Sequence, residues 1–172
     1  MTSADPRMPV RIPVRADWRF MRVRLSRWIA LGQGSGLSPV APGTAGTLWA
    51  WALFALFERW LSPLAWLVVI AIGFVAGVWA CTRTARDLGS ADPGAIVWDE
   101  IIAFWLVLVF VPGTFVDRLG AFFVFRFFDI VKPPPIRRVE HALKGGLGIM
   151  VDDVLAAGYS LLLFALWTQL TR

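Results

Sequence analysis

The sequence predicts an all-α protein, a polytopic membrane bundle of helices whose polar loops face the cytoplasm. The first observation is composition: of 172 residues, 58% are apolar and 17% are charged. Soluble domains average about 45–50% apolar and about 25% charged residues. The second is a series of apolar segments separated by Gly- and Pro-rich stretches, and the third is an uneven distribution of Lys and Arg. A single cysteine excludes an intrachain disulfide scaffold.

The chain begins with a basic arm, which we delimit as residues 1–28 and expect to lie in the cytoplasm. Its net charge of +5 equals that of the whole chain. The favoured role is an anchor on anionic lipid, where each basic residue contributes about 1 kcal/mol. Nucleic-acid binding is the rival role, but the arm contains no recognition motif, so we expect no nucleic-acid partner. The remaining residues, 29–172, are predicted to form one membrane-embedded domain.

Five apolar segments are candidates for membrane crossings. They are residues 45–57, 64–82, 95–111, 119–131 and 154–170. The second is the clearest, because its 19 residues include no charge and about 20 apolar residues suffice to cross a bilayer. The fourth is too short to cross and contains Arg126 and Asp129, so it is expected to be re-entrant or packed within the bundle.

The distribution of basic residues predicts the orientation. With five crossings, the arm and the stretches 83–94 and 132–153 lie on one side and carry thirteen Lys and Arg residues. The opposite side carries only Arg59, Arg118 and Arg172. Because basic loops stay in the cytoplasm, the basic side is the cytoplasmic one. The polar stretches 32–47, 83–100 and 129–153 then share that side, where they could assemble one site.

Five carboxylates lie at the ends of these apolar segments. They are Asp99, Glu100, Asp129, Asp152 and Asp153. Acidic side chains in apolar segments are costly, and neighbouring carboxylates repel unless a cation or a proton holds them together. Oxygen ligands in a chain with one His and one Cys favour Mg²⁺ over zinc, copper or iron. The alternative for either acidic pair alone is stabilisation of a helix N-terminus, but two pairs and Asp129 on one side favour a metal site.

Two further stretches contain groups suited to phosphate. The Gly-rich stretch 32–47 leads into an apolar helix and offers the hydroxyls of Ser38, Thr44 and Thr47, although a Gly- and Pro-rich loop alone is weak evidence. In the stretch 125–135, Arg126 and Asp129 share one helix face, and three prolines follow Lys132. Both cations suit a phosphate or a phospholipid headgroup, and the alternative is ordinary snorkelling to the membrane interface.

Together these motifs resemble the phosphatidylglycerophosphatase A family. The resemblance rests on residues 38–47, 97–100, 125–133 and 145–156, which occur in the order seen in that family. It implies a Mg²⁺-dependent, multi-pass enzyme of the bacterial inner membrane, a phosphoric monoester hydrolase. Its substrate would be the phospholipid phosphatidylglycerophosphate, which it would convert to phosphatidylglycerol and phosphate. Residues 29–172 would then be the phosphatase domain.

Roles for the individual residues follow from this hypothesis. Asp99, Glu100, Asp129, Asp152 and Asp153 would hold one or two Mg²⁺ ions, and Asp129, Asp152, Asp153 and Lys132 would be catalytic. Ser38, Thr44, Thr47, Arg126 and Lys132 would bind the phosphate and neutralise developing charge. Which carboxylate acts as a base stays open, as does a covalent aspartyl intermediate. The alternatives are a small cation or proton transporter with intramembrane carboxylates, and a non-catalytic scaffold.

Overall fold

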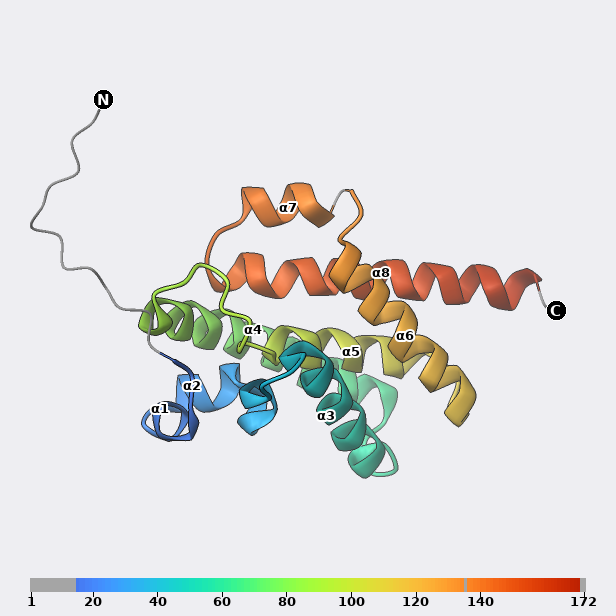
Figure 1. Ribbon diagram of the computed structural model, residues 1–172. Coiled ribbons are helices and arrows are strands. Elements are labelled where there is room, and N and C mark those ends of the chain that lie inside the picture. Colours follow the sequence, from blue (N-terminus) through green and yellow to red (C-terminus); the bar gives the residue numbers. More distant parts are fainter. Residues whose placement is uncertain (1–14, 135, 171–172) are drawn as a thin grey trace, which may run out of the picture.

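The computed structural model describes residues 15–134 and 136–170, and every regular element in these ranges is a helix (Figure 1). The elements are α1 (Trp18–Arg22), α2 (Leu25–Ala30), the 3₁₀ turn η1 (Gly32–Leu37), α3 (Pro42–Phe57), α4 (Pro63–Leu88), α5 (Trp98–Phe110), α6 (Phe115–Val131), α7 (Ile136–Ala142) and α8 (Gly146–Leu170). The prediction of an all-α fold is therefore confirmed for the described residues. Each predicted apolar segment corresponds to one helix, from α3 to α6 and then α8.

Local signals explain where the longer helices begin and end. Ser62 caps α4 by accepting a hydrogen bond from the Ala65 N–H, and Pro63 occupies its first position. Thr114 caps α6 in the same way through the Asp117 N–H. At the other end of α6, Lys132 adopts a left-handed conformation with φ of 46°, and Pro133 follows. The left-handed Lys132 and the prolines that follow it thus end α6.

Helix α5 lies at the centre of the fold. It contacts α3, α4 and α8, and Figure 1 shows α4, α5 and α8 running along one another. Its indole groups are tied to the surrounding helices: Trp98 donates to the Gly73 carbonyl and Trp105 to the Ala50 carbonyl, each at 2.9 Å. Phe104 is fully buried. The segment predicted as 95–111 is therefore a core helix enclosed by other helices.

Two of the described helices, α4 and α8, are long and apolar enough to cross a membrane, judged by length and composition. Five segments were treated as crossings on sequence grounds, so the structure offers fewer candidate spans than expected. Helices α3, α5 and α6 have 16, 13 and 17 residues, fewer than the about 20 that span a bilayer unaided. Large apolar side chains remain exposed along α4, at spacings that place them on one face: Leu64, Val68, Ile72, Val75 and Trp79.

The last part of the predicted basic arm is folded against the bundle. Met21 is fully buried in a cluster with Phe20, Leu31 and Leu88, and Arg27 pairs with Asp87 on α4 at 2.9 Å. Residues 1–14 of the arm lie outside the described residues. Packing therefore begins before residue 28, and the anchoring role of the arm stays a prediction.

The ends of five helices meet at one end of the bundle. The Gly146 N–H at the start of α8 donates to the Thr82 hydroxyl in the last part of α4 at 2.9 Å. A Cβ atom at Gly146 would lie 2.2 Å from the Val78 carbonyl oxygen, so only glycine allows this approach. The start of α3 and the last part of α6 reach the start of α5, where Gly43 and Arg126 both approach Glu100. This convergence brings the three polar stretches together.

Candidate active site

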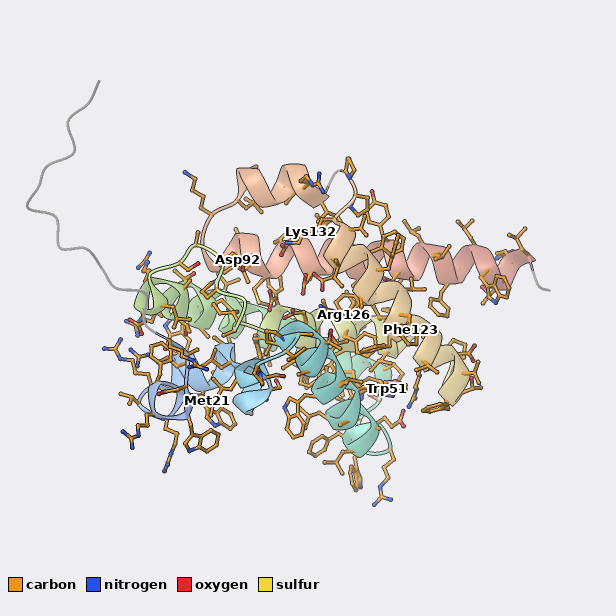
Figure 2. The ribbon with its side chains drawn as sticks, viewed as in Figure 1. Met21, Trp51, Asp92, Phe123, Arg126 and Lys132 are labelled. Carbon is orange, nitrogen blue, oxygen red and sulfur yellow. The ribbon has the colours of Figure 1, made fainter. Side chains whose placement is uncertain are left out.

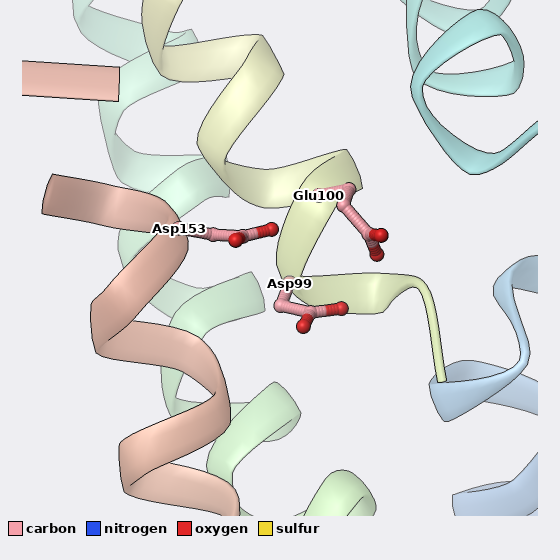
Figure 3. Close-up of side chains that lie close together, drawn as sticks. All are labelled: Asp99, Glu100 and Asp153. Atoms are coloured by element: carbon pink, nitrogen blue, oxygen red, sulfur yellow. The ribbon is translucent and has the colours of Figure 1, made fainter. Parts of the chain in front are cut away.

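Three carboxylates from two helices converge at this end of the bundle. Asp99 and Glu100 belong to the first turn of α5, and Asp153 belongs to α8. One ligand oxygen from each residue lies within 4.8 Å of the other two. Figure 3 shows Asp153 reaching from α8 toward the first turn of α5. We refer to Asp99, Glu100 and Asp153 as the carboxylate triad.

The triad leaves buried oxygen atoms without partners. Asp99 Oδ1, Glu100 Oε2 and Asp153 Oδ2 are inaccessible to solvent and accept no hydrogen bond from any described residue. Asp153 is only 3% exposed. A buried, unsatisfied carboxylate oxygen is unfavourable, and a shared cation removes the deficit for all three at once. The oxygen donors and their mutual distances fit a hard divalent cation such as Mg²⁺.

Burial and neighbouring charges change the pKa values of Asp99 and Glu100, which lie outside both candidate spans. Burial raises the pKa of Glu100 to about 7, although Arg126 acts in the opposite direction. Burial and the neighbouring charge of Glu100 also raise the pKa of Asp99 well above its ordinary range. In the absence of a cation, these groups therefore tend to keep a proton near neutral pH.

Arg126 links the triad to Asp129. Its Nη1 atom lies 2.5 Å from Asp129 Oδ2 and 3.5 Å from Glu100 Oε1, and its side chain is 13% exposed. The same Nη1 donates to the Thr47 hydroxyl at 3.4 Å. Arg126 and Asp129 share one face of α6, as their spacing predicted. The guanidinium is thus held beside the triad by groups from three helices.

Lys132 and Asp152 form a second ion pair. The Lys132 Nζ lies 2.5 Å from Asp152 Oδ2, and the side chain of Asp152 is 7% exposed. Lys132 is labelled at the end of α6 in Figure 2, beside α8. Asp152 and Asp153 are neighbours in sequence, and the Asp153 N–H donates to Asp152 Oδ1 at 3.1 Å. Their carboxylates nevertheless serve different partners.

The Gly-rich stretch reaches the site through the start of α3. A Cβ atom at Gly43 would lie 2.2 Å from Glu100 Oε1 and 2.9 Å from Arg126 Nη2. Thr47 is fully buried; its hydroxyl donates to the Gly43 carbonyl and contacts Arg126. Thr44, in the first turn of α3, is partly exposed. The Ser38 hydroxyl donates to the Val40 carbonyl in its own turn and does not join the site.

The predicted residue set therefore separates into groups. Three of the five predicted metal ligands form the triad, whereas Asp129 and Asp152 neutralise Arg126 and Lys132. Thr47 holds Arg126 and is not open to a phosphate. Sequence reasoning missed Gly43, whose lack of a side chain allows α3 to approach Glu100. A sequence signal for Gly43 existed, because this residue lies within the Gly-rich stretch 32–47 that was already singled out in the sequence.

The chain is similar to known proteins over most of its length. A family model described as Phosphatidylglycerophosphatase A matches residues 28–168. Two relatives carry that name: one from Haemophilus influenzae is 43% identical over 78% of this chain and 83% of its own, and one from Escherichia coli is 40% identical over 84% and 86%.

A third relative, from Bacteroides thetaiotaomicron, is 45% identical over 80% of this chain and 89% of its own, and is provisionally named a phosphatidylinositol-3-phosphatase. No solved structure shows a significant match. The matched region contains every residue of the site described above. The names of these relatives denote phosphoric monoester hydrolases, and the chain belongs to the phosphatidylglycerophosphatase A family.

Proposed function

We propose that this chain is a Mg²⁺-dependent lipid phosphatase that hydrolyses the terminal phosphate of phosphatidylglycerophosphate and leaves phosphatidylglycerol. The observation that carries the proposal is the carboxylate triad, whose buried oxygens lack partners and lie beside the Arg126 guanidinium. The Lys132 ammonium is held by Asp152, which precedes triad residue Asp153. This combination suits a phosphate monoester, which needs cations around its oxygens. The family and the names of two relatives support the choice of substrate.

Asp99, Glu100 and Asp153 would hold the metal. Bound there, Mg²⁺ would supply charge neutralisation at the phosphoryl oxygens and activation of water. Arg126 would donate its N–H groups to the same phosphate, and Asp129, Glu100 and Thr47 keep that guanidinium in place. Lys132 would add a second positive charge, oriented by Asp152. The first-turn N–H groups of α3 and the Thr44 hydroxyl would offer further donors to the phosphate.

The proposed setting is the bacterial inner membrane, with the site at the cytoplasmic end of the bundle. Helices α4 and α8 would cross the bilayer, and their exposed apolar side chains would face lipid. The basic residues of α1, α2 and the end of α4 lie at the same end as the site, which favours the cytoplasmic side. A phospholipid headgroup at the interface would then reach the triad without leaving its leaflet.

A transporter requires a different arrangement. Its carboxylates would lie near the middle of several spans and line an ion path. Here Asp99 and Glu100 occupy the first turn of a core helix, and Asp153 lies in the first third of α8. The family description names a phosphatase. The transport alternative therefore has no support.

Phosphate release from purified protein tests the proposal. The protein, in detergent micelles, is given phosphatidylglycerophosphate with Mg²⁺ or with excess EDTA. We expect turnover with Mg²⁺, none with EDTA, and recovery when Mg²⁺ is restored. Phosphatidylinositol 3-phosphate serves as the competing substrate, because one relative is named for it.

A matched control is Asp17→Asn. Asp17 caps α1, far in sequence from the triad, and Asn is an equally good cap. It should keep wild-type turnover. Full hydrolysis in EDTA by protein shown to be free of metal would refute the metal mechanism. Selective hydrolysis of the phosphoinositide would refute the substrate.

A further inference from the structure

A pocket adjoins the site on the side of Asp152. It has a volume of about 510 Å³ and lies between the loop after α4 and the loop before α8. Its lining includes Asp92, Lys144, Gly145, Gly148 and Asp152. Pockets that bind small ligands have volumes of about 300–1,000 Å³, so this one is large enough for a lipid headgroup.

The pocket shares the residue Asp152 with the site. Asp152, which lines it, pairs with Lys132 and precedes triad residue Asp153. The pocket and the triad are therefore adjacent along the first turns of α8, where Asp152 and Asp153 follow one another. Figure 2 labels Asp92 on the loop between α4 and α5 and Lys132 at the end of α6.

Two charged side chains in the pocket have no partner among the described residues. Asp92 and Lys144 are exposed, and neither forms a hydrogen bond or an ion pair with another described residue. By contrast, Asp152 is engaged with Lys132, and Arg24 and Arg27 are engaged with Asp87. A free carboxylate and a free ammonium group in one pocket can receive a ligand that offers both a hydroxyl group and an anion.

The headgroup of the proposed substrate has this chemistry. Between the diacylglycerol and the terminal phosphate it carries a phosphodiester, with one negative charge, and a glycerol linker, with one free hydroxyl. We propose that this pocket is the headgroup subsite: Asp92 accepts a hydrogen bond from the linker hydroxyl, and Lys144 pairs with the phosphodiester. This inference rests on the proposed function, and it adds the residues that would select a glycerol linker.

An analogue in which the linker hydroxyl is replaced by hydrogen isolates the role of Asp92. We expect the wild-type kcat/KM to be about tenfold higher for phosphatidylglycerophosphate than for this deoxy analogue, because a hydrogen bond to a charged group is lost. Asp92→Ala should lower kcat/KM about tenfold for the natural lipid and leave the value for the analogue nearly unchanged. Asp92→Asn, which keeps an acceptor oxygen, should retain part of the preference.

A second variant tests the cation. Lys144→Gln should raise KM for the natural lipid about two- to fivefold at similar kcat, and should leave the hydrolysis of a simple alkyl phosphate, which has no phosphodiester, unchanged. Arg59→Gln is the matched control, because Arg59 stacks on Trp60 in the loop between α3 and α4, at the opposite end of the bundle. Its KM should equal that of the wild type.

Failure of the headgroup subsite and failure of the proposed function give different results in these experiments. Equal losses on the natural lipid and the deoxy analogue in Asp92→Ala would mean a structural role and would overturn the subsite, as would unchanged kinetics in both variants. If thermal unfolding shows that Asp92→Ala does not fold, the kinetics of Asp92→Asn and Lys144→Gln test the subsite in its place. A wild-type protein that hydrolyses neither lipid overturns the proposed function, and the subsite with it.

Discussion

Replacing Asp153 with Asn should have the opposite effect on stability from replacing Asp129 or Asp152 with Asn. Asp153 belongs to the triad and forms no salt bridge among the described residues, whereas Asp129 and Asp152 neutralise Arg126 and Lys132. Asp153→Asn should therefore keep or increase stability without metal, and Asp129→Asn and Asp152→Asn should decrease it. All three should lose at least about 10²-fold in turnover.

The size of each effect follows from the geometry. Two ionised oxygens at the outer distance of 4.8 Å repel by about 3.5 kcal/mol at an effective dielectric constant of about 20. Burial keeps part of the triad protonated, so Asp153→Asn relieves only a fraction of this repulsion. Removing Asp129 leaves a guanidinium that is 13% exposed with Glu100 at 3.5 Å. Breaking a buried pair costs about 3–5 kcal/mol, and the remaining carboxylate lowers that figure somewhat.

Thermal unfolding with and without Mg²⁺, measured beside turnover, distinguishes the cases. At a concentration of Mg²⁺ about 100 times its Kd, binding stabilises the wild type by about 2.7 kcal/mol. For a chain of this size that corresponds to a rise in Tm of about 5–11 °C. The rise should be absent in Asp153→Asn. A lower metal-free Tm for Asp153→Asn, together with a full Mg²⁺-dependent rise, would refute the assignment of the triad.

Two further predictions test the surroundings of the site. Gly43→Ala places a Cβ atom 2.2 Å from Glu100 Oε1, so kcat/KM should fall about 10–100-fold with little change in Tm, because a side-chain end can move. Gly158→Ala, with open space around its Cβ position, is the control and should keep activity with an equal or slightly higher Tm; equal kinetics in the two variants would contradict the contact. Met21→Ala should lower the free energy of unfolding by about 2–5 kcal/mol in a denaturation experiment, because Met21 is fully buried. No change would show that residues 15–28 are separate from the bundle.

The sequence alone determined the helical segments and the chemistry of the site. Apolar runs and the prolines after Lys132 predicted helices near their observed bounds. The acidic residues at the ends of these runs predicted a cluster of oxygen ligands. These properties are local, because they depend on residue type and on neighbours within a few positions.

Only the tertiary structure decided which helices are long enough to cross a membrane and which carboxylates lie close together. Helix α5 looked like a span, but its 13 residues are enclosed by α3, α4 and α8. Asp152 and Asp153 looked equivalent in sequence. Each residue of an α-helix is rotated by about 100° from the one before, so neighbouring side chains point to different surroundings. Asp153 therefore faces the start of α5 and joins the triad, whereas Asp152 faces the end of α6 and pairs with Lys132.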